Sequence, residues 1–66
     1  MQLTVNGQDL HISADATVAI LLQRPEYAGR RVAVEVNGAI VPRSQYDATR
    51  LTNGDRVEVV QAIGGG

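Results

Sequence analysis

The residues most suited to chemistry in this sequence are the three glycines at its end, Gly64, Gly65 and Gly66. Glycine has no Cβ atom, so a glycine segment can enter a channel too narrow for any other residue. Three extended residues span about 10 Å, which would carry a terminal carboxyl group into the active site of a partner protein. A carboxylate is a poor electrophile. We therefore expect it to react only after activation, for which an acyl adenylate made from ATP is the usual route.

No cysteine occurs in the chain, which bears directly on what the glycine end could carry. Disulfides, thiolate zinc sites and iron–sulfur clusters are excluded, and so is sulfur held as a persulfide on this chain. A sulfur nucleophile that displaced AMP from an adenylated Gly66 would instead leave a thiocarboxylate. The alternative is that the glycines are a disordered end or a remnant of an expression tag.

The length and the charge of the chain further limit the classes of protein to which it could belong. A chain of 66 residues fits one domain, at a size where a single core is only marginally stabilising. The formal net charge is −1, and the 6 basic residues, all arginines, are scattered, which argues against a nucleic-acid partner. No segment approaches the roughly 20 apolar residues of a membrane span, and no secretory signal is visible. We therefore expect no membrane partner and a cytoplasmic location.

The first part of the chain predicts a hairpin followed by a short helix. Asn6-Gly7 favours a type I′ turn, because both central residues of that turn need a positive φ angle. The resulting register places alternating apolar residues on one face: Met1, Leu3, Val5, Leu10 and Ile12. Thr17 is the expected N-cap of the helix, and Pro25 should end it near Arg24. The apolar stripe of the helix is Val18, Leu21 and Leu22.

The rest of the chain predicts strands separated by turns. In order these are a strand over 32–36, an Asn37-Gly38 turn, a strand over 39–41, a polar segment over 43–50 with a turn or short 3₁₀ helix, an Asn53-Gly54-Asp55 turn and a strand ending near Gln61. The order β-β-α-β-β-β favours an α+β fold of the β-grasp (ubiquitin-like) type, with a mixed sheet of four to five strands packed on one helix. The right-handed crossover preference makes the first and last strands parallel neighbours. We expect a single domain over 1–66 with a flexible glycine tail over 64–66.

Two segments resemble the sulfur carriers of thiamine biosynthesis, the ThiS family. The segment over 53–66 is similar to the end of these carriers, with its Asn-Gly-Asp turn, apolar strand and terminal Gly-Gly. The segment over 36–43, Val-Asn-Gly-Ala-Ile-Val-Pro-Arg, resembles their V-N-x-x-I-V-P-R segment. The Asn6-Gly7 hairpin and the length agree, so the resemblance covers the whole chain. Two departures are Gly64, where the family often has alanine, and Pro25, which interrupts a helix that runs longer in relatives.

The resemblance implies a set of partners. An E1-like adenylyltransferase of the ThiF type would adenylate Gly66 with ATP and magnesium. A cysteine desulfurase or sulfurtransferase would supply the sulfur, and a thiazole synthase of the ThiG type would accept it. The chain itself would be a carrier and co-substrate, not an enzyme, with no cofactor of its own.

Several residues outside the terminal glycine are candidates for partner binding: Arg43, Val60, Ala62, Ile63, Gly64 and Gly65. Val60 should lie on the opposite face of its strand from Val57 and Val59, where it could join Ala62 and Ile63 in a docking patch for the activating enzyme. Arg43 follows Pro42 and could contact a partner carboxylate, although a solvated position explains it equally well.

Three other side chains with reactive or aromatic groups have simpler explanations. His11 should face away from the core, and no second ligand nearby suggests a metal site. Tyr27 and Tyr46 are expected at the edge of the core.

Three other functions remain open from the sequence. Molybdopterin carriers use the same chemistry, but they are usually longer and often have an aromatic residue where Val59-Val60 stands. A protein modifier would also be adenylated, although a chain with no lysine cannot form polymers on its own side chains. The third alternative is a β-grasp interaction module with an inert tail.

Overall fold

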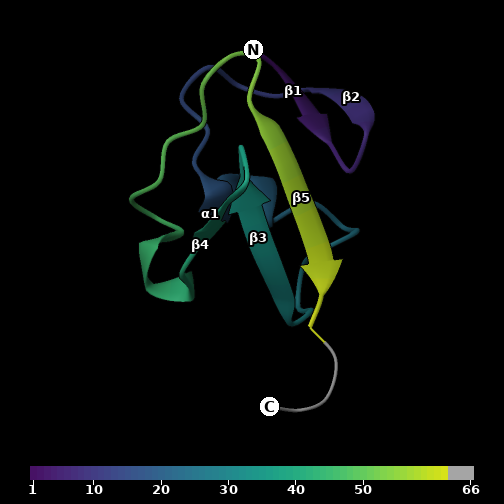
Figure 1. Cartoon of the computed structure of the whole chain (residues 1–66), viewed down its shortest axis with the longest axis vertical. Helices are drawn as coiled ribbons and strands as arrows, with labels where there is room; N and C mark the ends of the chain where they lie inside the picture. The colour runs from purple at the N-terminus through teal and green to yellow at the C-terminus, as the bar shows by residue number, and fades with distance from the viewer. Residues whose placement is uncertain (63–66) are drawn as a thin grey trace.

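Residues 1–62, which a computed structural model describes, form a five-stranded mixed sheet with one short helix against it (Figure 1). The elements are β1 (Gln2–Val5), β2 (Gln8–His11), α1 (Val18–Leu21), β3 (Val32–Val36), β4 (Ala39–Val41), the 3₁₀ helix η1 (Arg43–Gln45) and β5 (Arg56–Gln61). The strand order is β2-β1-β5-β3-β4, in which β1 and β5 are parallel and the other neighbours antiparallel. The predicted β-grasp fold and the parallel pairing of the first and last strands are confirmed.

The two Asn-Gly turns have the conformation that the sequence predicts. Asn6 and Gly7 have φ angles of 51° and 81°, and Asn37 and Gly38 have 52° and 86°. Positive values at both central residues are the signature of the type I′ hairpin turn. The predicted register of the first hairpin is also correct, since Leu3 pairs with Leu10 across β1 and β2.

Both turn asparagines also bond to β5 through their side chains, which the sequence did not predict. The Val59 backbone N–H donates to Asn6 Oδ1 at 2.8 Å, and Asn6 Nδ2 donates to the Val59 carbonyl at 3.0 Å. Asn37 Nδ2 donates to Asp55 Oδ1 at 2.9 Å, and the Arg56 N–H donates to Asn37 Oδ1 at 3.0 Å. The turns therefore brace the strand that leads to the glycine segment.

Replacing Asn6 by glycine separates the bracing role from the turn role. Asn6→Gly keeps the positive φ angle accessible but removes both side-chain bonds to Val59. We expect a loss of about 1 to 3 kcal/mol in the free energy of unfolding, because each net hydrogen bond contributes about 0.5 to 1.5 kcal/mol. Urea denaturation measures this loss. An unchanged midpoint would mean that the side chain serves only the turn.

The helix begins where predicted and ends earlier. Thr17 is the N-cap, and its Oγ1 accepts a bond from the Ile20 N–H at 3.2 Å. The prediction that α1 reaches almost to Arg24 is wrong, because the α-helix stops at Leu21. The Gln23 and Arg24 N–H groups bond to carbonyls only three residues back, as from the Arg24 N–H to the Leu21 carbonyl at 3.2 Å. This tighter turn leads the chain to Pro25, before which helical geometry is disfavoured.

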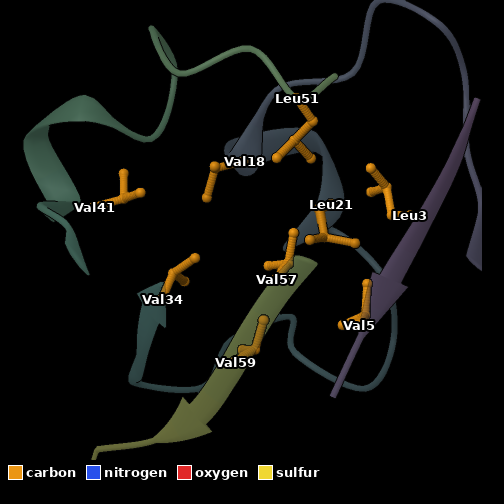
Figure 2. Packing of buried hydrophobic residues seen from close by; sticks show 9 residues of the cluster. All are labelled: Leu3, Val5, Val18, Leu21, Val34, Val41, Leu51, Val57 and Val59. Atoms are coloured by element: carbon orange, nitrogen blue, oxygen red, sulfur yellow. The ribbon is translucent and has the colours of Figure 1, made fainter. Parts of the chain in front are cut away.

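The core lies between α1 and the inner face of the sheet, where the labelled side chains of Figure 2 point toward one another. It consists of Leu3, Val5, Val18, Leu21, Val34, Val41, Leu51, Val57 and Val59. The predicted inward residues Met1, Leu10 and Ile12 are partly buried against it, and so are Tyr27 and Tyr46, as expected. The segment before β5 holds the start of the helix in place. The Val18 N–H donates to the Thr49 carbonyl at 2.9 Å, and the Leu51 N–H to the Ala16 carbonyl at 3.0 Å.

Candidate functional site

The central strand of the sheet, β5, leads the chain to the glycine segment. β5 lies between β1 and β3, and it runs to the end of the sheet at which β3 begins (Figure 1). Gln61 pairs with Val32, and the Ala62 N–H donates to the Arg31 carbonyl at 2.9 Å. The point at which the chain leaves the sheet is therefore fixed by backbone bonds as far as Ala62.

Most of the predicted reactive segment follows this point. Ile63, Gly64, Gly65 and Gly66 lie outside the described residues, so their proposed roles stay predictions. Ala62 is exposed beside the exit from the sheet. The geometry thus places Ala62, the last described residue and two positions before Gly64, at a defined, accessible end of the sheet.

Val60 lies on the outer face of the sheet, opposite to the helix. Its side chain is 56% exposed, whereas Val57 and Val59 of the same strand are buried. The prediction that Val60 lies on the opposite face from these two residues is confirmed. Ala33 of β3 lies opposite Val60. Ile40 of β4, which is 74% exposed, adds a second aliphatic side chain to the same face. Val60 therefore places an exposed aliphatic side chain near the exit of the chain, and Ile40 lies farther away on the same face.

Two glutamates lie between these aliphatic side chains. Glu35 of β3 and Glu58 of β5 are paired directly across antiparallel strands, and Ile40 is the partner of Glu35 on its other side. Like charges in this arrangement are destabilising. Neither glutamate takes part in an ion pair within residues 1–62. The sequence alternation predicts that each points outward, but only the strand order brings them together. A cation supplied by a partner would relieve their repulsion.

Arg43 begins η1 and is exposed at the rim of a pocket. The pocket lies on the helix side of the sheet, and the structure therefore separates Arg43 from Val60 by the thickness of the sheet. Arg30 lies at the same pocket, although nothing in the sequence singled it out. The two arginines share this pocket because the loop over 25–30 and η1 both line it, and no local sequence signal indicates that arrangement.

Among residues 1–62, His11 has no partner that would suggest catalysis or metal binding. It is exposed near the outer edge of the sheet in β2, so it faces away from the core as predicted. In the described part of the chain, no group of three His, Cys, Asp or Glu side chains is placed to hold a metal ion. Over the same residues, no helix has the length and apolar character needed to cross a membrane.

Comparison with known proteins extends over the glycine segment as well as the sheet. The model of the ThiS family matches residues 2–66. The sulfur carrier protein ThiS of Escherichia coli is 33% identical over 66 residues, with each chain covered over its full length. A crystal structure of the thiamine biosynthesis protein ThiS from Geobacter metallireducens has a TM-score of 0.85 at 38% identity, again with both chains fully covered.

A longer protein is also similar. A thiazole synthase of Paramagnetospirillum magneticum is 44% identical over 66 residues, which cover all of this chain but 20% of that protein. The chain thus spans about a fifth of the length of this relative.

Proposed function

This chain belongs to the ThiS family, and from that premise we propose that it carries sulfur for thiazole formation in thiamine biosynthesis. The sulfur is held as a thiocarboxylate on Gly66. The observation that carries the proposal is the position of the glycines, which follow the central strand of a β-grasp sheet by two residues. A rigid body and a segment without side chains together suit delivery of one reactive group into a partner.

Loading requires three steps. A carboxylate oxygen of Gly66 attacks the α-phosphorus of ATP, pyrophosphate leaves, and an acyl adenylate forms. The terminal sulfur of a persulfide on the donor then attacks the carbonyl carbon, and AMP leaves. A thiol attacks the donor's sulfur atom in the resulting acyl disulfide, forms a disulfide with it, and releases the thiocarboxylate. The adenylyltransferase of the ThiF type binds ATP and magnesium, and a cysteine desulfurase or sulfurtransferase supplies the sulfur as a persulfide. The chain is a co-substrate in each step, not the catalyst.

The outer face and the segment after it form the docking surface for the activating enzyme in this proposal. Val60, Ala62 and Ile63 provide apolar contact, while Gly64 and Gly65 enter the channel to the active site. The unpaired Glu35 and Glu58 suit a surface that places an arginine or lysine between apolar side chains. The acceptor is a thiazole synthase of the ThiG type, which the similarity to a longer protein of that name supports.

A positive charge at Val60 is expected to weaken activation while leaving the fold intact. Val60→Arg removes apolar contact and would repel the cation that we expect opposite the glutamates. Because the side chain is 56% exposed, the free energy of unfolding should change by no more than about 0.5 kcal/mol. The KM of the activating enzyme for this chain should rise about tenfold or more, since like charges brought together across an interface cost several kcal/mol.

Gln2→Arg is the matched control for this substitution. It adds the same charge to the same face, at the opposite end of the sheet from the exit of the chain. Its KM should remain near that of the unmodified chain. Equal KM values for Val60→Arg and the unmodified chain would remove Val60 from the docking surface.

Complementation tests the pathway. Expression of the chain in cells that lack their own thiazole sulfur carrier should restore growth without added thiazole, and a chain shortened by Gly65 and Gly66 should not. Growth with the shortened chain would contradict the proposal. Rescue of a strain that lacks the molybdopterin carrier, without rescue of the thiazole strain, would assign the chain to the other pathway.

A further inference from the structure

A pocket on the helix side of the sheet is lined by residues that have no role in the proposed loading reaction. Its volume is about 300 Å³, and it is open to solvent. Leu22 and Val32 provide apolar contact, Tyr27 and Tyr46 provide aromatic rings, and Arg30 and Arg43 provide charge. The pocket therefore combines two cations with an apolar and aromatic wall.

Neither cation is neutralised by another residue within 1–62. No acidic residue is among the described residues that line the pocket. Within residues 1–62, Arg30 and Arg43 form no ion pair, whereas Glu26 in the same loop pairs with Arg24 at 3.5 Å between Oε2 and Nε. A guanidinium group binds a carboxylate through two parallel hydrogen bonds, so the pocket is complementary to an acidic group.

Backbone and side-chain bonds hold the walls of the pocket in place. The Tyr46 hydroxyl donates to the Val32 carbonyl at 3.3 Å, which joins the end of η1 to β3. The Tyr46 N–H bonds to the Arg43 carbonyl at 3.1 Å, and the Arg30 N–H bonds to the Tyr27 carbonyl at 3.0 Å. Because these contacts exist before binding, little ordering is needed when a ligand enters.

The pocket adjoins the point at which the chain leaves the sheet. Arg31, whose carbonyl accepts the bond from Ala62, lies between Arg30 and Val32 in the chain. A partner that holds the glycine segment therefore has the pocket within reach, and its second contact forms at a high effective concentration. The pocket also lies on the face opposite to Val60, so the docking surface assigned to the activating enzyme leaves it free.

The pocket is too open to bury most of a small molecule, as a dedicated ligand site would. It suits instead a single acidic side chain with an apolar or aromatic neighbour. We propose that this pocket binds an acidic segment of the protein that accepts sulfur from Gly66, and so anchors that acceptor on the helix side of the sheet. This inference rests on the proposed function, in which the acceptor is a thiazole synthase.

Charge reversal at the pocket tests the inference. The probe is purified thiazole synthase from the same organism, and its binding to the unloaded chain is followed by surface plasmon resonance. Arg43→Glu and, separately, Arg30→Glu should each raise the Kd about tenfold or more and lower the association rate. The dependence of the Kd on salt should become weaker in both variants, because a screened attraction has been removed.

Arg50→Glu is the control, since it makes the same charge change at an exposed arginine outside the pocket. Its Kd should stay within about twofold of the unmodified chain, as expected for an isolated surface charge. Equal Kd values for Arg43→Glu and Arg50→Glu would overturn the inference. Lost binding to the activating enzyme, with unchanged binding to thiazole synthase, would overturn it as well. Thiocarboxylation of the unmodified chain is measured separately, so failure of the proposed function is distinguishable from failure of this inference.

Discussion

A chain with one alanine added after Gly66 is expected to show no activation by the adenylating enzyme. The extra residue moves the carboxyl carbon by about 3.5 Å, and the added methyl group must enter a channel suited to glycine. Attack on ATP requires the reacting atoms to lie about 3 to 3.5 Å apart, so a displacement of this size removes the reactive geometry. Release of pyrophosphate, measured with the purified enzyme and ATP, reports the loss.

The matched control adds one residue ahead of Met1 instead. This chain has the same length as the extended one but keeps Gly66 at its end, and its rate of pyrophosphate release should equal that of the unmodified chain. Equal rates for the two lengthened chains would show that the enzyme does not measure the distance from the sheet to the carboxyl group.

Leu21→Ala is expected to have the largest effect on the fold. Leu21 is fully buried between α1 and the sheet (Figure 2). Removing such a side chain costs about 2 to 5 kcal/mol, through lost burial and the cavity left behind. A domain of this length has only about 3 to 10 kcal/mol of stability in total. We therefore expect a large unfolded fraction and a melting temperature lowered by at least about 10 °C, followed by circular dichroism.

Ile20→Ala serves as the comparison in the same helix. Ile20 is 41% exposed, and alanine has the higher helix propensity, so the melting temperature should change by only a few degrees. Similar shifts for the two variants would contradict the assignment of Leu21 to the centre of the core.

Local features of the fold could be predicted from the sequence because single residues impose them. Asn6-Gly7 and Asn37-Gly38 tolerate positive φ angles, so they indicate both hairpin turns. The alternation of Val57 and Val59 with Glu58 determines which side of the last strand is buried. The parallel pairing of β1 with β5 follows from the handedness of the crossover.

Features that depend on strand order could not be predicted in this way. The side-chain bonds from Asn6 to Val59 require the first turn to lie against β5. The opposition of Glu35 and Glu58 requires the register between β3 and β5. The end of the helix at Leu21 could not be predicted for a different reason. It depends on a tightened turn whose position Pro25 alone does not specify.

The candidate site likewise has one part that the sequence indicates and one part that only the folded chain reveals. The glycine segment could be identified as the candidate reactive site from the sequence, because a chain without cysteine would need its terminal carbonyl to hold sulfur. Its chemistry stays a prediction. The pocket of Arg30 and Arg43 could not be predicted, because its walls come from a loop and a 3₁₀ helix that only the folded chain brings together.

Intact-mass spectrometry after loading tests the central claim most directly. The chain is incubated with its adenylating enzyme, ATP, magnesium and a sulfur donor, and the product is fragmented along the backbone. We predict a mass increase equal to the exchange of one oxygen atom for one sulfur atom, carried by fragments that contain Gly66. An unchanged mass, with an enzyme that activates another carrier under the same conditions, or sulfur located on any fragment without Gly66, would contradict the account.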